Sequence, residues 1–265
     1  MSVPLIKRNF KQMIKPLLIF VAVLCMYQGV IIYMFDPKLM DMLNDYQKAL
    51  PQMMAAVGMT GATNTLIEFV NTYLYGFLMQ LFPFIFILII GNNFLMKYVD
   101  TGSMAVLLAS PNSRMKIILT QAVSLIVSVV IIMTILTLTG IGFSEGLFPG
   151  ELDIPVFIEL NASALLMQLA VAGIIFFAAS VFNESKYFYA IGCGLPLCFF
   201  LCSMSGNMGD KLEKFKYVSI YTLFPAKKIV ESSGGVAGCH VALACIVLVL
   251  FAVGIAVFRK KDLSI

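Results

Sequence analysis

Few side chains in this sequence belong to the types that carry chemistry. The six cysteines stand at positions 25, 193, 198, 202, 239 and 245, and the one histidine is His240. All six cysteines fall in or beside apolar runs, and none forms a Cys-x-x-Cys pair. Metal sites need clustered ligands, and disulfide frameworks need regular cysteine spacing. The sequence therefore predicts neither, and the cysteines are interpreted as small apolar packing residues.

Motifs for nucleotide chemistry are also missing from the sequence. There is no Gly-rich phosphate loop followed by Lys and Ser or Thr, and no dinucleotide fingerprint. We therefore expect no catalytic residue and no bound cofactor or metal in this chain. If ATP drives the protein, the ATPase must be another polypeptide.

The elements that position the remaining residues are long and apolar. Of the 265 residues, 60% are hydrophobic and only 12% are charged, whereas a soluble domain has roughly 25% charged residues. A helix that crosses a bilayer needs about 20 apolar residues. The sequence predicts a single all-α membrane domain over residues 1–265, with six spans near 17–35, 74–96, 117–143, 156–182, 187–204 and 236–258.

Three segments qualify this outline. Residues 1–16 carry four basic residues and no acid, which favours a basic amphipathic lead-in at the inner leaflet. The polar segments 36–73 and 206–233 are predicted to form short outer helices before the second span and between the fifth and sixth. The first is either a lid over a substrate path or a helix packed on the outer face, and we favour packing.

Four side-chain amides lie within the predicted spans: Gln80, Asn92, Asn93 and Gln168. Polar groups at membrane depth face either a water-filled path or other helices. A substrate path and interhelical hydrogen bonding therefore both remain open for these residues. In the fifth span, Gly192, Gly194 and Pro196 predict a kink or break.

The loop at 98–116 combines a helical pattern with clustered turn residues. Met104, Leu107 and Leu108 stand at i, i+3 and i+4, so they share one face of a helix. The pattern predicts a short helix over 99–110 that lies across the membrane surface. Such a helix is equally well a simple interfacial connector with no partner.

Turn residues set the limits of this helix. Asp100 or Thr101 can cap its start, because a side-chain oxygen there satisfies free amide donors. Pro111 is expected to end it. Ser110 and Pro111 are then predicted to be the cap and first residue of the next helix.

The residue order of this loop resembles that of a known family. It contains Asp100, Gly102, Ser103, Leu107, Leu108, Pro111, Ser113 and Arg114. This order is similar to the cytoplasmic loop between the second and third membrane helices of ABC-2-type transporter permeases. The segment order of the whole chain is similar too, but the sharp matches lie mainly here. Ser103 stands where Thr is usual, and Ala105 stands where many members carry a second acid.

The resemblance implies a function and a set of partners. In that family the loop is a coupling helix that docks on an ATP-binding subunit, which assigns the eight residues above, with Met104, to docking. The chain would be the non-catalytic membrane subunit of an exporter, paired with a second identical or related permease. Two ATP-binding subunits would hold ATP and Mg. The other expected partner is membrane lipid, with no nucleic acid, and lipids, amphipathic peptides or hydrophobic drugs would suit as substrates.

Charge predicts the orientation without use of the family. Six spans place both termini on one face, and that face holds 11 Lys or Arg and 3 acids, against 7 basic and 11 acidic residues opposite. The basic face is expected in the cytoplasm. The membrane is expected to be a plasma membrane, and the compact architecture is typical of bacteria. The segment 206–233 argues against this orientation, since it has five lysines and three acids.

Two other classes of protein compete with this interpretation. A secondary transporter or channel usually buries an ionisable residue or shows an internal repeat, and neither is evident. An intramembrane enzyme needs an activated nucleophile or a metal at membrane depth. The sequence has no paired His/Glu motif, and His240 has no obvious acidic partner.

Overall fold

The computed structural model describes residues 1–36, 42, 45, 49–56, 64–104, 107, 113–208 and 210–260. Within these ranges the chain is helical and contains no strand. Six helical segments are long and apolar enough to cross a membrane. They are Val3–Tyr33 (α1), Leu78–Asp100, Arg114–Leu147 (α8), Ile154–Val181 (α9), Ser185–Asn207 and Val236–Lys260 (α13). The predicted fold class is confirmed.

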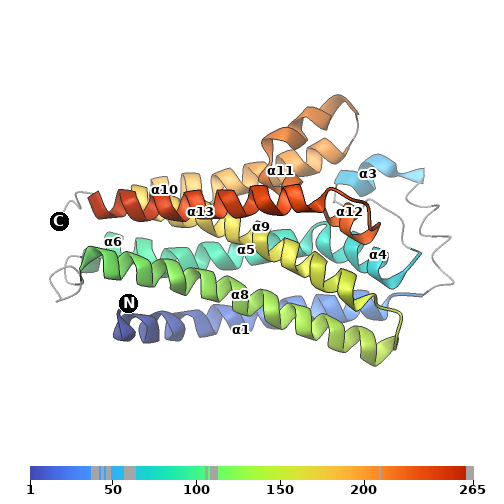
Figure 1. The fold of residues 1–265 in the computed structure, drawn as a ribbon, viewed down its shortest axis with the longest axis horizontal. Helices are drawn as coiled ribbons and strands as arrows, with labels where there is room; N and C mark the ends of the chain where they lie inside the picture. Colours follow the sequence, from blue (N-terminus) through green and yellow to red (C-terminus); the bar gives the residue numbers. More distant parts are fainter. Residues whose placement is uncertain are drawn as a thin grey trace.

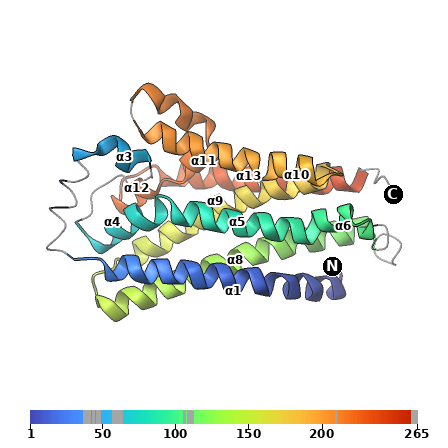
Figure 2. The same cartoon turned by 180° about the vertical axis from the view of Figure 1, so that it is seen from behind.

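The long helices run along a common axis, and both ends of the chain lie at the same end of the bundle (Figures 1 and 2). We call this end the terminal end and the opposite end the distal end. The short helices α3 (Pro51–Ala56), α4 (Leu66–Val70) and α12 (Ala226–Val230) lie at the distal end. The shared location of the termini agrees with six crossings.

The first two spans differ from their predicted limits. α1 begins at Val3 and not near residue 17, because the basic lead-in and the apolar run form one continuous helix. The second span is built from α5 (Leu78–Gly91), the π-helical η3 (Asn92–Met96) and α6 (Lys97–Asp100). It begins after a break at Gly76 and Phe77, which separates it from the π-helical η2 (Asn71–Tyr75).

The predicted break in the fifth span is present. The helix is interrupted at Cys193, between α10 (Ser185–Gly192) and α11 (Gly194–Asn207). The segment that follows forms the 3₁₀ helices η4 (Asp210–Val218) and η5 (Ile220–Leu223), and then α12. Pro51 is the first residue of α3, a position that suits its missing N–H.

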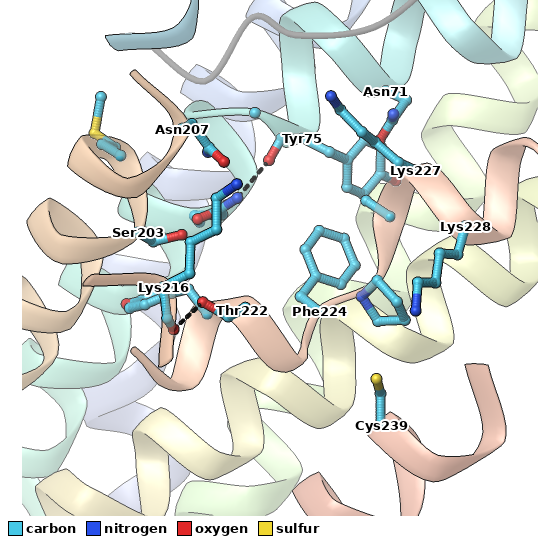
Figure 3. A pocket seen from close by; sticks show the side chains of 16 residues that line it. Asn71, Tyr75, Ser203, Asn207, Lys216, Thr222, Phe224, Lys227, Lys228 and Cys239 are labelled. Carbon is cyan, nitrogen blue, oxygen red and sulfur yellow. Dashed lines mark hydrogen bonds between the residues drawn. The ribbon is translucent and has the colours of Figure 1, made fainter. Parts of the chain in front are cut away.

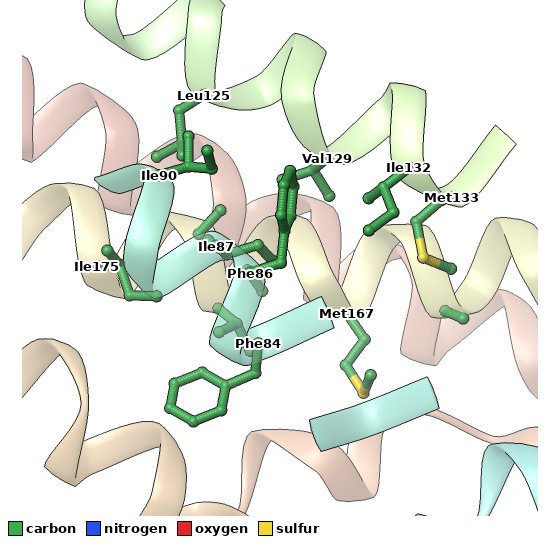
Figure 4. Packing of buried hydrophobic residues seen from close by; sticks show 14 of the residues in the cluster. Phe84, Phe86, Ile87, Ile90, Leu125, Val129, Ile132, Met133, Met167 and Ile175 are labelled. Carbon is green, nitrogen blue, oxygen red and sulfur yellow. The ribbon is translucent and has the colours of Figure 1, made fainter. Parts of the chain in front are cut away.

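Helix α9 is the most enclosed of the six. Of its most apolar stretch, 72% is buried, against 17–50% in the other five. Small residues allow this enclosure: a side chain at Gly173 would begin 3.0 Å from Leu250, and one at Gly254 would begin 2.9 Å from Phe176. Figure 4 shows the core between α5, α8 and α9, where Phe84, Phe86, Ile87 and Ile90 meet Leu125, Val129, Ile132, Met133, Met167 and Ile175.

Polar side chains join α1 to α8 inside the bundle. Asn9 donates to Gln121 and to Ser124. Further along, Gln28 donates to the carbonyl oxygen of Leu136 and accepts from Thr139, both at 3.2 Å. Interhelical hydrogen bonds therefore account for several of the buried polar groups in the spans.

Candidate functional sites at the two ends of the bundle

The turn after α6 is set by a single glycine. Helix α6 ends at Asp100, and Gly102 has a φ of +66°. Residues other than glycine are strained in this left-handed region of backbone conformation. Ser103 and Met104 then resume a helical conformation. The chain thus makes a tight turn between the second span and the loop.

Hydrogen bonds show that this turn forms the C-terminal cap of α6. The Thr101 hydroxyl donates to the carbonyl oxygen of Lys97 at 2.7 Å, and its oxygen lies 2.7 Å from that of Ser103. The prediction that Asp100 or Thr101 caps the following helix is therefore wrong. Asp100 is the last residue of α6, and Thr101 follows as its C-cap.

Asp100 also joins two spans that are distant in sequence. Its carboxylate accepts a hydrogen bond from the hydroxyl of Ser185, the first residue of α10. Asp100 is exposed and Ser185 is half-buried. The second and fifth spans are therefore connected at the surface of the terminal end, beside the Gly102 turn.

The apolar side of the predicted docking helix faces the chain itself. Met104 is 3% exposed and belongs to the core, and Leu107 is partly buried and packs against that core. Asp100, Thr101 and Gly102 are exposed. The exposed groups of the turn are thus accessible to a partner at this end. Leu108 and Pro111 lie outside the described residues, so their predicted roles stay predictions.

The start of α8 differs from the predicted start. The helix begins at Arg114, and Ser113 is its N-cap, whose side chain accepts from the amide of Lys116 at 3.2 Å. Ser110 and Pro111 were predicted to be the cap and the first residue of this helix, and that prediction is wrong. Ser113 has an extended backbone and a hydroxyl in reach of the free amides, which is what an N-cap requires.

The distal end contains a pocket of about 400 Å³. Its wall comes from η2, the start of α5, the end of α11, η4, η5, α12 and the start of α13. Among the predicted path residues it includes Gln80. Figure 3 shows Lys216 on one side of the pocket and Lys227 and Lys228 on the other. Sequence reasoning noted these lysines only as an exception to the charge rule.

The structure brings together only two of the four predicted path residues. Gln168 is fully buried on α9, and its amide donates to the carbonyl oxygens of Met79 and Gln80, both at 3.0 Å. The amide of Gln80 itself donates to the carbonyl oxygen of Tyr75. Asn92 and Asn93 lie apart from this pair, half-buried in the π-helical turn η3.

Two acidic or nucleophilic features were not singled out from the sequence. Gly142–Gly146 matches the Gly-x-Ser-x-Gly pattern of hydrolases, whose serine sits on a strand-to-helix turn. Here Ser144 lies inside the continuous helix α8, so the structural context of that motif is missing. Glu159 falls within the predicted fourth span, but it is exposed in the second turn of α9.

These features define a multi-pass helical membrane protein with a structured turn at one end and a lysine-lined pocket at the other. The model of the ABC-2 family transporter proteins matches residues 3–263, and the chain belongs to this family. The chain matches no curated protein and no solved structure. Family membership makes it a membrane permease of an ABC transporter, which associates with an ABC ATP-binding subunit.

Proposed function

We propose that the chain is the permease subunit of an ATP-driven exporter in a bacterial plasma membrane, with the terminal end in the cytoplasm. Two permease chains pair with two ATP-binding subunits, which hold ATP and Mg. The substrate, a lipid, amphipathic peptide or hydrophobic drug, moves between the permeases. This chain supplies the path and the docking surface and no catalytic residue.

One observation carries the coupling part of this proposal. The exposed turn at Asp100–Gly102 lies at the same end as both termini, between two spans of a chain that belongs to the ABC-2 family. Because Asp100 is hydrogen-bonded to Ser185, a displacement of the turn is transmitted to the second and fifth spans together. Motion of an ATP-binding subunit thus has a direct route into the membrane.

A tagged chain purified from its native membranes tests the proposal. An ATP-binding subunit should copurify, crosslinking should give at least a permease pair, and transport in vesicles should require ATP. A permease that copurifies with no ATPase and transports under an ion gradient alone would support the competing secondary transporter or channel.

A further inference from the structure

The pocket at the distal end gathers three lysines that form no close ion pair within the described part of the chain. Lys216, Lys227 and Lys228 all contribute to its wall. Among the described residues, none of the three ammonium groups lies within 4 Å of a carboxylate. Partial desolvation lowers the pKa of Lys227, Glu231 acts in the opposite direction, and the neighbouring charge of Lys216 lowers it further. Like charges brought together in this way favour an anion between them.

A neutral donor completes the polar side of the pocket. The amide of Asn71 is part of the wall (Figure 3). The ammonium groups and this amide together match the oxygens of a phosphate.

The rest of the wall is apolar. Tyr75, Met204, Phe224 and Pro225 contribute to it, and the volume of about 400 Å³ lies within the roughly 300–1,000 Å³ of small-molecule sites. A purely inorganic anion would leave this apolar part unused. The combination suits a ligand that carries an anionic group on an apolar body.

The element beside the pocket places it at the membrane surface. η4 exposes Leu212, Phe215, Tyr217 and Val218, and Tyr217 is 85% exposed. Exposed aromatic and aliphatic residues interleaved with lysines are typical of segments that lie at the level of the lipid headgroups. The pocket therefore opens where a headgroup is within reach.

We propose that this pocket binds the phosphate headgroup of an anionic lipid. The assignment to the outer leaflet rests on the orientation given under Proposed function, but binding itself does not. The site also explains the basic segment 206–233, whose five lysines run against the charge rule. Three of these lysines are held at the pocket for a ligand and do not report orientation.

Native mass spectrometry of the purified full chain, titrated with phosphatidylglycerol or phosphatidylcholine, tests the proposal. The wild-type chain should bind phosphatidylglycerol at least tenfold more tightly than phosphatidylcholine. Lys216→Gln should weaken this binding about fivefold, and the triple change at Lys216, Lys227 and Lys228 about a hundredfold, since each lysine near a membrane surface contributes about 1 kcal/mol. Lys214→Gln is the matched control, because Lys214 is exposed on the same η4 but does not line the pocket.

A second measurement uses Cys239, a native thiol in the pocket wall. Phosphatidylglycerol should slow its alkylation, as located by peptide mass spectrometry, and phosphatidylcholine should not. Equal binding of the two lipids, or an unchanged preference in the triple variant, would overturn the proposal. Equal protection by millimolar inorganic phosphate in phosphatidylcholine nanodiscs would assign the site to a small anion and reject a lipid. None of these readouts needs the ATPase, so failure here leaves the proposed function standing.

Discussion

The side-chain amide of Gln168 donates to the main-chain carbonyl oxygen of Met79 at 3.0 Å. In a regular helix that carbonyl accepts from the residue four positions later, which here is Pro83. Proline has no N–H, so its helix loses this hydrogen bond. A neighbouring helix must then supply the donor, because no water does so in the bilayer core. Gln168 on α9 supplies it to α5.

This relationship predicts the effect of removing the amide. Gln168→Leu should lower the free energy of unfolding by about 1–3 kcal/mol, because buried carbonyls lose their donor. In a Pro83→Ala background the new N–H of residue 83 can reach Met79, so the same change should cost less. Unfolding of the four proteins in detergent measures the difference. An equal cost in both backgrounds would contradict the pairing, and a transport defect without any loss of stability would favour the substrate-path interpretation.

Hydropathy was sufficient to locate the spans but not their ends. The six apolar runs follow from chain length against bilayer thickness, and the break at Cys193 follows from Gly192, Gly194 and Pro196. The start of α1 at Val3 could not be predicted in the same way. A basic amphipathic segment and an apolar one have different compositions, yet the backbone passes from one to the other without a change of conformation.

Features that depend on local backbone conformation or on contacts between distant segments could not be predicted from the sequence. Several hydroxyls near α8 could have served as its cap, and only the extended backbone of Ser113 decides among them. The partner of Gln168 depends on which helix packs against α9, and one sequence does not contain that information. The pocket at the distal end likewise joins Asn71 to Lys216 and Lys227 through folding alone.

Close approach of three helices at Gly140 gives a second prediction. A methyl group there would collide with the Gln28 side chain and would lie 2.7 Å from the Phe157 ring. Gly140→Ala should therefore destabilise the protein by about 1–3 kcal/mol. Gly142, on the same helix, has nothing within 4 Å of its added methyl. Gly142→Ala should be neutral or stabilising by about 0.5–1 kcal/mol, and equal thermal unfolding of the two variants would rule out close packing at Gly140.

The proposed orientation predicts which residues are accessible from outside the cell. In a cysteine-free background, single cysteines at Lys7 and Lys260 should be shielded from an impermeant thiol reagent in intact cells. Cysteines at Glu151 and Glu213 should be labelled, the second within the lysine-rich segment. All four side chains are exposed in the structure, so protection reports the membrane and not burial. Labelling of Lys260→Cys from outside would reverse the orientation.

The last prediction concerns the exposed turn at the terminal end. Substituting Leu107 with Asp is a poor test of docking, because Leu107 packs on the core of its own chain. Asp100 offers a cleaner one, since it is exposed and its one described side-chain partner is Ser185. Asp100→Asn removes the charge that a partner would meet. Ser185→Ala removes the internal hydrogen bond and keeps the charge.

The two variants separate docking on the ATP-binding subunit from the internal hydrogen bond between Asp100 and Ser185. If Asp100 contacts the ATP-binding subunit, Asp100→Asn should reduce the amount of ATPase that copurifies, and Ser185→Ala should leave it near the wild-type level. Arg114→Ala should have a smaller effect, because exposed ion pairs contribute only about 0–1 kcal/mol. Expression, membrane insertion and ATPase recovery are measured in the same preparation. Equal loss in Asp100→Asn and Ser185→Ala would show that Asp100 acts by holding α6 to α10, and full retention in both would remove Asp100 from the docking surface.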